Sequence, residues 1–502
     1  IELSLALAPA VTTEVTMSST LFSDDHWNGK LFTGIWTTGS SNSPVIEPAT
    51  GAVLGQVAMA DAQIIRKSAA TARECQKAWA GKSYDQRAAI LRRTAVAAEQ
   101  HFEEIVNLLV KESGSVRAKA QFEVSLSIKC LQESSALPAS SCGEVLPSAP
   151  GQLSLARRRP LGVVGVISPF NFPMYLAMRA VAPALALGNG VVLKPDPRTA
   201  VCGGYTIARL FELADLPSGL LHVLPGDGMV GAALIADPDI AMIQFTGSTQ
   251  AGRKVAESAG RHLKKVSLEL GGKNSLIVLD DADIETAVAN AAWGSFLHQG
   301  QICMASGRIL VQRNIYDRFV IELATLASSL KVGNPADSDV ALGPLINEAQ
   351  LNHVAHVVRT ARETGAKVMA GGNADGLFYP ATVLADVSPA NDAFRSEIFG
   401  PVAVLTPFDT DDEAIALAND TEYGLSAGVI TRDVGRALRI GDQLRTGLLH
   451  INDQTVNDDV INPFGGIGAS GNGTSIGGPA NWEEFTQWQW VTVKGEAPKY
   501  IL

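Results

Sequence analysis

The sequence predicts an α/β protein with two lobes, each built on a parallel sheet that helices cover on both faces. The chain has 502 residues, about three times the usual ~150 of a domain, so it can bury a large core beside a separate ligand cleft. Hydrophobic residues make up 46% of it and charged residues 18%, a composition typical of soluble globular proteins. Short β-branched runs alternate with helix-length segments along most of the chain, which is the pattern of β-α-β units.

The elements follow one another in a regular order. Residues 61–135 carry apolar residues at helical spacing with almost no Gly or Pro, and they predict a layer of helices. Five apolar runs predict the strands of the first sheet: Leu161–Ile167, Val191–Leu193, Leu220–Leu224, Ala241–Phe245 and Val266–Glu269. The second lobe is predicted from strands at Ser275–Val278, Ile309–Val311, Val402–Thr406 and Leu448–Ile451, with helices at Ile284–His298, from Tyr316 and after Asp409.

Three segments fall outside this alternation. Ser135–Leu155 is rich in Ser, Pro and Gly, and Thr486–Val493 alternates polar with apolar residues, so both predict strands of a small projecting sheet. Residues 1–16 precede Met17 and resemble a short export segment without its basic start, which favours a leader or an added sequence. The predicted division is 17–134 with 159–270 for the first lobe, 271–479 for the second, and 135–158 with 480–502 for the small sheet.

Charge and cysteine content exclude several classes of protein. The chain has 40 Lys and Arg against 51 Asp and Glu, a net charge of −11 that repels nucleic acids and anionic membranes. Its densest basic run, Arg157–Arg159, is too short for a nucleic-acid footprint, and no apolar run approaches the ~20 residues of a membrane helix. Five cysteines without a C-x-x-C spacing offer neither a disulfide framework nor a zinc site. We therefore expect a cytoplasmic protein without a bound metal.

A glycine turn between a strand and a helix favours a dinucleotide ligand. In the segment from Phe245 to Gly252, the turn at Gly247 and Ser248 presents the free N–H groups of a helix start, which suit a pyrophosphate. Lys194 adds a cation at the end of another predicted strand. The usual G-x-G-x-x-G is absent, and a turn of this kind often does no more than connect its strand to its helix.

Three further residues have the chemistry of acyl transfer. Glu269 lies between leucines at a strand end, where partial desolvation would raise its pKa toward that of a general base. Cys303 lies in a loop after a helix and could be an activated nucleophile. Asn171 follows a strand, and its amide could donate to an oxyanion. Taken singly, each has a plain alternative. Glu269 could be a solvated carboxylate, Cys303 a buried small side chain, and Asn171 a turn residue between prolines. A pairing of Cys303 with His298 is a further, less favoured interpretation.

The motifs occur together and in order. They are Pro169–Pro173, Lys194–Pro195, Phe245–Thr249, Leu268–Gly272, Gly300–Cys303, Glu397–Pro401 and Pro463–Gly466. This series resembles the aldehyde dehydrogenase superfamily from about residue 30 to 495. The strings Phe296–Met304, His450–Asp453 and Gly477–Ala480 look most like its bacterial benzaldehyde dehydrogenase branch, to which salicylaldehyde and vanillin dehydrogenases are similar. The resemblance implies an aldehyde dehydrogenase-like fold with two Rossmann-like lobes and a small oligomerisation flap.

The resemblance also implies a reaction and its residues. Cys303 would attack the aldehyde carbon, Asn171 and the Cys303 backbone N–H would hold the oxyanion, and hydride transfer would leave a thioester that Glu269 hydrolyses through water. The implied cofactor-binding residues are Lys194, Gly247, Ser248, Gly252, Phe170, Glu397 and Phe399. The strands at 135–158 and 486–495 match those through which the family self-associates, as a homodimer or a homotetramer.

Two positions depart from the family pattern. Members strict for NAD usually carry Glu three residues after the lysine of the Lys-Pro motif, and here that position is Pro197, followed by Arg198. The cofactor is therefore predicted as NAD or NADP. Phe170 stands where the family often has Trp, which keeps an apolar wall but removes an N–H donor.

For the substrate, we predict an aromatic aldehyde. The entrance is predicted to include an apolar and aromatic set with one cation, namely Phe172, Tyr175, Arg179, Ile302, Met304 and Phe464. These residues could equally be ordinary core. Because Arg179 could pair with a substrate carboxylate, the alternative substrate is a semialdehyde that carries a carboxylate. An alternative from another class is a non-catalytic structural or binding protein of this fold.

Overall fold

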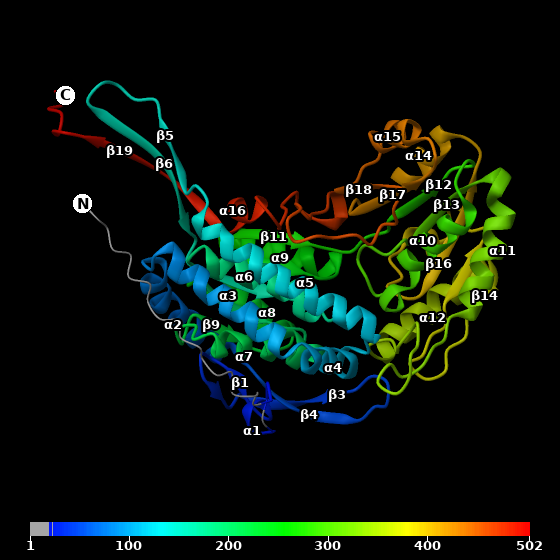
Figure 1. Ribbon diagram of the computed structural model, residues 1–502, viewed down its shortest axis with the longest axis horizontal. Coiled ribbons are helices and arrows are strands. Elements are labelled where there is room, and N and C mark those ends of the chain that lie inside the picture. The colour runs from blue at the N-terminus through cyan, green and yellow to red at the C-terminus, as the bar shows by residue number, and fades with distance from the viewer. Residues whose placement is uncertain (1–19, 23, 502) are drawn as a thin grey trace, which may run out of the picture.

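The computed structural model of the chain describes residues 20–22 and 24–501, so the predicted leader at 1–16 lies outside the described residues. Two lobes, each with its own sheet, lie side by side, and a slender sheet projects from the first lobe (Figure 1). The predicted α/β architecture is confirmed. No helix of the described part of the chain is long and apolar enough to span a membrane.

The first sheet has seven strands in the order β11-β10-β7-β8-β9-β1-β2. Its five parallel strands are the five predicted ones, with ends shifted by a few residues: β7 (Val163–Ile167), β8 (Gly190–Lys194), β9 (Leu221–Val223), β10 (Ile240–Thr246) and β11 (Lys265–Glu269). Every residue of β7 and β8 is buried, as expected for strands covered on both faces. The prediction missed β1 (Leu31–Phe32) and β2 (Trp36–Thr37), which add antiparallel pairs at one edge.

Helices cover both faces of this sheet. One face packs on α2 (Ala62–Ala80), α8 (Gly228–Ala236) and α9 (Thr249–Arg261). The other packs on α3 (Tyr84–Gln100), α4 (Phe102–Ser113), α5 (Arg117–Ala136), α6 (Pro173–Ala186) and α7 (Thr206–Leu213). The predicted helical layer over 61–135 is thus present as four helices. A hairpin of β3 (Ser41–Ile46) and β4 (Val53–Met59) and the short α1 (Asp24–Trp27) complete this lobe.

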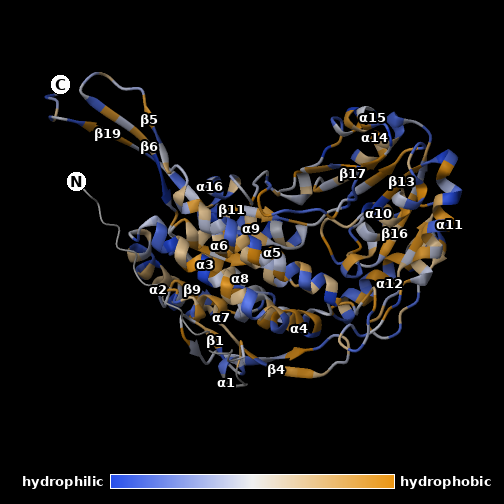
Figure 2. Ribbon diagram, viewed as in Figure 1, coloured by the Kyte–Doolittle hydropathy of each residue, from blue (hydrophilic) through white to orange (hydrophobic). Residues whose placement is uncertain are grey.

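The second sheet runs β14-β15-β16-β13-β12-β17-β18. Its strands are β12 (Ser275–Val278), β13 (Arg308–Gln312), β14 (Lys367–Ala370), β15 (Thr382–Ala385), β16 (Val402–Phe408), β17 (Ser426–Ile430) and β18 (Leu448–Ile451), all parallel except β14. Apolar residues gather on its central strands β13 and β16 (Figure 2). The helices α10 (Ile284–Phe296) and α11 (Arg313–Ser329) pack on one face, and α12 (Glu348–Glu363), α14 (Asp411–Asn419) and α15 (Val434–Gly441) on the other.

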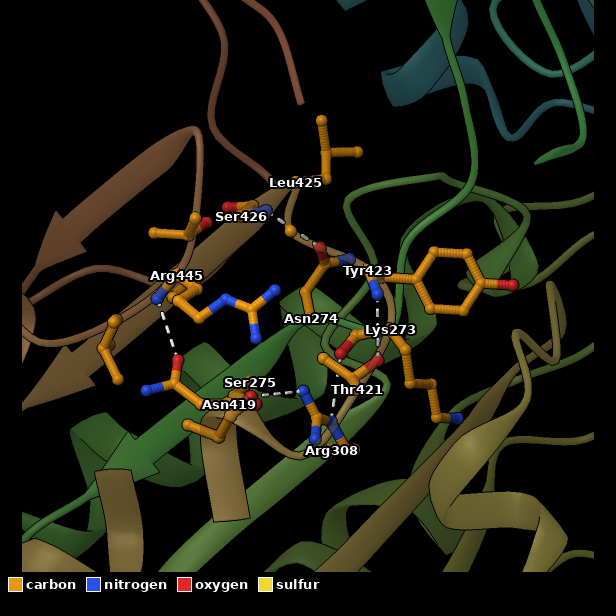
Figure 3. Close-up of a pocket in the computed structure, with 15 residues that line it drawn as sticks. Lys273, Asn274, Ser275, Arg308, Asn419, Thr421, Tyr423, Leu425, Ser426 and Arg445 are labelled. Carbon is orange, nitrogen blue, oxygen red and sulfur yellow. Dashed lines mark hydrogen bonds between the residues drawn. The ribbon is translucent and has the colours of Figure 1, made fainter. Parts of the chain in front are cut away.

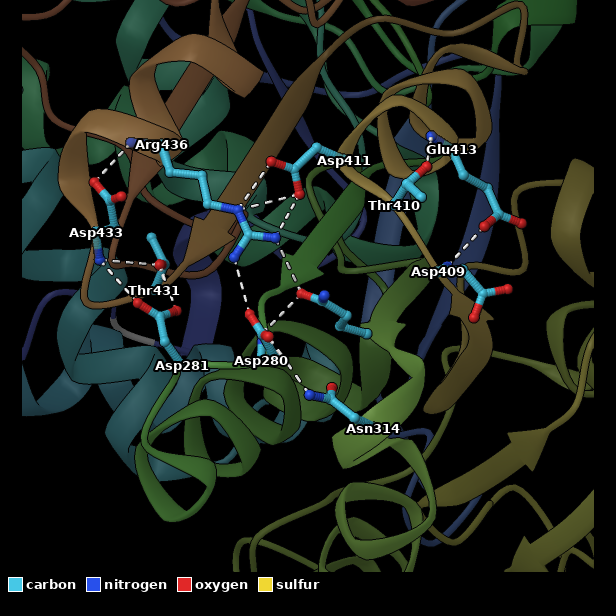
Figure 4. A network of polar contacts seen from close by, with 11 residues as sticks. Asp280, Asp281, Asn314, Asp409, Thr410, Asp411, Glu413, Thr431, Asp433 and Arg436 are labelled. Atoms are coloured by element: carbon cyan, nitrogen blue, oxygen red, sulfur yellow. Dashed lines mark hydrogen bonds and ion pairs between the residues drawn. The ribbon is translucent and has the colours of Figure 1, made fainter.

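A network of charges ties together the carboxyl ends of this second sheet (Figure 4). Arg436 of α15 binds Asp411 of α14 and, at 2.9 Å, Asp280, which lies just beyond β12. Asp281 accepts hydrogen bonds from the Thr431 hydroxyl at 2.6 Å and from two backbone N–H groups after β17. The network fixes the loops at this end of the lobe.

The projecting sheet consists of β5 (Gly143–Leu146), β6 (Gln152–Pro160) and β19 (Thr486–Lys494), with β6 in the middle and all pairs antiparallel. Both predicted segments thus contribute strands. The prediction began the first segment too early, because α5 and a 3-10 turn continue to Ala139. The short helix α16 (Ala480–Phe485) leads into β19.

Candidate active site

A cavity of about 410 Å³ lies where the two lobes meet. Nine of the predicted site residues line it: Phe170, Asn171, Lys194, Gly247, Ser248, Glu269, Cys303, Glu397 and Phe399. On the first sheet they follow the carboxyl ends of strands, as the rule for parallel sheets predicts. On the second lobe they lie before the amino ends of β13 and β16 instead, so the two sheets present opposite ends to one cavity.

The loop that carries Cys303 begins with a tight turn. The helix predicted to reach His298 ends at Phe296, because His298 and Gln299 adopt the left-handed conformation with φ near 50°. Gly300 continues this turn at φ 64°, where an added Cβ would lie 2.1 Å from the Gly400 carbonyl. The turn redirects the chain from α10 into the cavity.

The Cys303 carbonyl accepts a hydrogen bond from the Asn274 side chain. The Asn274 amide donates to the carbonyls of Cys303 and Ala305 at 2.8 and 2.9 Å, and its oxygen accepts from the Ser426 N–H, a bond drawn in Figure 3. Gly272 lies so close to the same carbonyl that an added Cβ would be 2.5 Å from its oxygen. The loop that carries Cys303 is therefore fixed to β12 and β17.

The surroundings of the Cys303 sulfur favour the protonated thiol. The side chain is half-buried, and burial raises the pKa of the Cys303 thiol well above its ordinary value. The carboxylates of Glu397, Glu269 and Asp458 raise that pKa further, because a thiolate near them is a like charge. Formation of a thiolate therefore needs a group that accepts its proton.

Glu269 has the properties of a general base. It is the last residue of β11 and 4% exposed, and neither carboxylate oxygen has a hydrogen-bond partner in the protein. Burial raises the pKa of Glu269 well above 4.5; the Arg179 guanidinium opposes this shift, and Asp458 and Glu484 add to it. This direction agrees with the one expected from the sequence, and it moves the pKa of Glu269 toward the range of a general base.

Asn171 lies just before the start of α6, and its side chain is fixed against the loop that carries Cys303. Its Nδ2 donates to the Gln301 carbonyl at 2.9 Å, which leaves the second N–H of the same amide for another acceptor. The Asn171 carbonyl accepts from Lys119 Nζ at 2.6 Å. The side-chain amide of Asn171 is thus held by Gln301 and its backbone by Lys119.

Lys119 forms a buried ion pair that the sequence analysis did not identify. It lies one turn from Glu123 on α5, both side chains are fully buried, and Nζ donates to the Glu123 carboxylate. The other oxygen of Glu123 accepts from the N–H groups of Met174 and Tyr175 at 2.8 and 3.2 Å, which caps the start of α6. A Lys and a Glu four residues apart usually mark an exposed helix face, so the sequence carried no distinct signal for this pair.

The first-lobe part of the cavity offers donors for a dinucleotide. Lys194 ends β8 and is 8% exposed; its Nζ donates to the Gly226 carbonyl at 2.7 Å. Ser248 caps α9 through the Ala251 N–H, so the start of that helix opens into the cavity. Gly252 lies one turn further on and packs on Leu270, where an added Cβ would be 2.4 Å from Cδ2. The structure therefore places Gly252 in helix packing, outside the cavity lining.

The second-lobe part holds Glu397 and Phe399. Glu397 accepts the Gly272 N–H at 3.0 Å, and burial raises its pKa to about 7. The ring of Phe399 meets that of Phe170 edge to face, with centroids 5.7 Å apart. The Arg198 guanidinium stacks on the Phe170 ring, 4.2 Å from its centroid. It donates hydrogen bonds of 2.6 and 2.8 Å to the Asp196 carboxylate.

The predicted substrate set lies outside the lining of this cavity, in the core cluster that includes α6. Phe172, Tyr175, Ile302, Met304 and Phe464 are all buried there. Arg179 lies among them, forms an ion pair with Asp458, donates to the carbonyls of Asn462 and Ile476, and stacks 4.7 Å from the centroid of Phe464. No hydrogen bond joins His298 to Cys303 among the described residues, and the His298 ring packs on Phe172 instead.

The geometry is that of a dinucleotide-binding enzyme with a thiol. One cavity holds a thiol, a carboxyl group of raised pKa, an amide donor and a helix start that suits a dinucleotide. A family model for the aldehyde dehydrogenase family matches residues 36–491, and the chain belongs to that family. It is 54% identical to a vanillin dehydrogenase of Amycolatopsis sp. (strain ATCC 39116 / 75iv2), over 95% of this chain and 99% of that protein. It is 48% identical to a benzaldehyde dehydrogenase [NAD(+)] of Pseudomonas putida, over 94% and 98%.

Solved structures give the same result. A betaine aldehyde dehydrogenase of Staphylococcus aureus in complex with NAD+ matches with a TM-score of 0.92 at 29% identity, over 95% of this chain and 97% of that one. A lactaldehyde dehydrogenase of Escherichia coli matches with a TM-score of 0.90 at 34% identity, over 93% and 99%. The family expected from the motifs is confirmed.

Proposed function

We propose that this chain oxidises an aromatic aldehyde to its carboxylic acid, with NAD or NADP as the hydride acceptor. The observation that carries the proposal is the convergence of Cys303, Glu269 and Asn171 on the cavity that also holds Lys194 and Ser248. The names of the two curated relatives support an aromatic substrate. In this interpretation the first lobe, residues 17–134 and 159–270, binds the dinucleotide, and 271–479 supplies the thiol.

The residues divide the oxidation into two easier steps. The Cys303 thiol gives its proton to solvent water and its sulfur bonds to the aldehyde carbon, while the free N–H of Asn171 and the Cys303 backbone N–H stabilise the oxyanion. NAD or NADP, held by Lys194, Ser248 and Glu397, would supply the acceptor for the hydride of that carbon, which would leave a thioester on Cys303. Glu269 then takes a proton from water, the hydroxide bonds to the thioester carbon, and the carbon–sulfur bond breaks to release the acid.

The residues present fit a dinucleotide cofactor. The α9 start with its Ser248 cap suits a pyrophosphate, and the Lys194 ammonium and Glu397 carboxylate suit hydroxyl groups of the two riboses. Lys194 Nζ and Glu397 are each oriented by a backbone contact.

Substrate kinetics on purified enzyme test the substrate class. Benzaldehyde, salicylaldehyde and vanillin should give a higher kcat/KM than succinic semialdehyde, because Arg179 is already neutralised by Asp458. A clear preference for succinic semialdehyde would support the carboxylate-bearing alternative instead. Cys303→Ala should lose several orders of magnitude in rate, as does removal of other covalent nucleophiles; retained oxidation would refute the mechanism, and an inactive parent would favour the non-catalytic alternative.

The choice between NAD and NADP depends on Arg198. Its guanidinium is about one-third exposed and lines the cavity near Lys194, where it suits a 2′-phosphate, but Asp196 already neutralises part of its charge. We infer that the enzyme uses both cofactors. Rates at matched concentrations test this, and an NADP rate a hundredfold below the NAD rate would exclude it. Arg198→Ala should raise KM for NADP more than KM for NAD.

We further propose that the projecting sheet mediates self-association as a homodimer or homotetramer. Val145 and Trp490 are 74% and 72% exposed on it, which favours burial against a second copy. Sedimentation should give a monomer after truncation before Thr486. The cysteines among the described residues are all unpaired, which favours a reducing compartment, and cell fractionation should find the enzyme in the cytoplasm.

A further inference from the structure

The segment that crosses from the first lobe to the second, residues 270–274, carries a buried lysine. It connects the end of β11 at Glu269 to the start of β12 at Ser275. Lys273 is 2% exposed, and no group in the described part of the chain accepts a hydrogen bond from its Nζ. Its backbone is fixed, because the Lys273 carbonyl accepts from Arg308 Nε at 3.0 Å (Figure 3). A buried amine without a partner is unfavourable, so its surroundings must compensate for the missing hydrogen bonds.

A small cavity beside Lys273 offers that compensation. Its volume is about 20 Å³, which is room for about one water molecule. The cavity is lined by Lys273, by Glu397, and by Gly300 and Gly307, which flank Cys303 in its loop. An added Cβ at Gly307 would lie 3.4 Å from Lys273 Nζ, so the lysine side chain reaches this loop. A water in the cavity can accept from the Lys273 ammonium and donate to the Glu397 carboxylate.

Glu397 lies between this small cavity and the large one, because it lines both. Its Oε1 accepts the Gly272 N–H at 3.0 Å, whereas its Oε2 has no protein partner among the described residues. Lys273 lines the small cavity and is absent from the lining of the large one. The ammonium group can therefore affect a ligand in the large cavity only through Glu397.

The charges of Lys273 and Glu397 depend on each other. Burial and the Arg308 guanidinium lower the pKa of Lys273 to about 7, against the opposite effect of Glu397 and Asp392. Burial raises the pKa of Glu397 to about 7, against the opposite effect of the Gly272 N–H and of Lys273. The ammonium thus favours the carboxylate form of Glu397. A carboxylate accepts hydrogen bonds at both oxygens, whereas the protonated acid donates from one of them.

Other titratable groups lie close to this pair, namely Arg308, Asp392 of α13 (Asp392–Arg395), Tyr423, Cys303 and His353. Arg308 donates to four backbone carbonyls, and no hydrogen bond joins it to Glu397 in the described part of the chain. The His353 ring bonds the backbone carbonyl of Glu397, at 3.1 Å, and not its carboxylate. Tyr423 and Cys303 are acids whose pKa Glu397 raises, so they supply no positive charge. Among these groups, Lys273 is the cation placed to stabilise the Glu397 carboxylate.

We propose that Lys273 is a positioning residue that keeps Glu397 in its carboxylate form, through one bridging water, so that Glu397 can accept the ribose hydroxyls of the dinucleotide. The proposal rests on the proposed function, which assigns Glu397 to a ribose of the cofactor. No covalent bond changes and no electron moves. Loss of the ammonium should raise the pKa of Glu397. Dinucleotide binding should then weaken near neutral pH and recover at alkaline pH, where Glu397 ionises without help.

Calorimetric titration of the purified enzyme with NAD between pH 6 and pH 9 tests this role without turnover. In Lys273→Met, the apparent pKa that governs the Kd for NAD should rise by about one pH unit, the lower end of what a nearby opposite charge produces. At pH 7, NAD should therefore bind about fivefold more weakly than to the parent, and at pH 9 about equally. Lys367→Met is the matched control: it removes an exposed lysine of the same sheet, which pairs with Asp386, and should leave the Kd unchanged at every pH.

Two results separate this role from a structural one. Lys273→Met replaces an unpaired buried amine by an apolar side chain of similar length, so it should melt at or above the temperature of the parent. If it melts lower, Lys273→Gln carries the same test, since it keeps a polar group without the charge. In a Glu397→Gln background, Lys273→Met should change the Kd for NAD by less than about twofold at any pH, because the group through which it acts is gone.

A loss of affinity that is equal with and without the Glu397 carboxylate would overturn this role. So would a Kd for NAD that is the same in Lys273→Met and in the parent across the whole pH range. A parent enzyme that binds NAD but oxidises no aldehyde would instead overturn the proposed function.

Discussion

Removing the ammonium group of Lys119 is expected to cost both stability and turnover. Lys119→Met keeps the aliphatic volume but leaves the Glu123 carboxylate buried without its counter-ion. It also removes the Nζ donor to the Asn171 carbonyl and the cation 4.1 Å from the Phe172 ring centroid. Glu123 would retain the two backbone N–H groups at the start of α6, which cannot replace a full charge.

The expected loss of stability follows from the Glu123 charge that remains buried in Lys119→Met. Breaking a buried ion pair by removing one partner costs about 3–5 kcal/mol, since an uncompensated charge stays behind. If the first lobe melts as a unit of about 250 residues, at ~2–4 °C per kcal/mol, the melting temperature should fall by roughly 6–20 °C. The double variant Lys119→Met/Glu123→Gln removes both charges of the pair and keeps an oxygen for the two backbone N–H groups at the start of α6. It should recover most of that loss, because neutral replacements of buried pairs are often isoenergetic.

Thermal melting and steady-state kinetics, run on the same samples, separate the two effects. Both variants lack the donor to Asn171, so kcat should stay low in the double variant even where its melting temperature has recovered. A Lys119→Met protein that melts within about 2 °C of the parent would refute the assigned cost of the pair. Full recovery of kcat in the double variant would refute the assigned role in holding Asn171.

Four further outcomes are expected. Glu269→Gln should keep the burst of reduced nicotinamide but slow thioester hydrolysis, and an unchanged steady-state rate would exclude Glu269 as the base. The raised pKa of Glu269 means that the folded state holds this proton more tightly than the unfolded one, so stability falls as pH rises between the two pKa values; Glu269→Gln should therefore raise the melting temperature more at pH 8 than at pH 5, and an equal shift at both would count against this. Activity of the parent should decline toward acid pH as Glu269 becomes protonated, whereas a flat profile down to pH 5 would show that another group is the base. Gly252→Ala should lower the melting temperature through its contact with Leu270 and leave KM for NAD unchanged; a raised KM with normal melting would restore the predicted cofactor role.

Most of the strands that the sequence predicted in the two lobes are buried on both faces. β7 and β8 have only buried residues, so their apolar runs are continuous and recognisable. β17 is just as buried, but its sequence Ser-Ala-Gly-Val-Ile has few β-branched residues, and the pattern did not predict it. β1 and β2 have two residues each; they pair with each other, and β1 also pairs with β9, a contact that no local signal encodes.

The site residues also fall into two groups, those that a sequence motif predicts and those that only tertiary packing brings together. The cavity-lining residues were predicted because each lies in a short motif whose residue types and order are informative. Lys119 and Glu123 were missed because their spacing is that of an ordinary exposed pair, and only the packing of α5 on α6 buries them. Arg179 was predicted at the substrate entrance, whereas in the structure it forms an ion pair with Asp458, which lies 279 residues further along the chain and has no motif. Long-range ion pairs of this kind are decided by tertiary packing.

The arrangement of charges in the cavity makes proton removal a central problem for the proposed reaction. The pKa values of Cys303, Glu269 and Glu397 are all raised, and burial is the largest cause for each of the three groups. Oxidation of an aldehyde to a carboxylate by NAD and water releases two protons, both of which come from the water, and the thiol gives up a further proton that it regains when the carbon–sulfur bond breaks. A base with a raised pKa accepts protons readily and releases them slowly, so its usefulness depends on an exit for the proton.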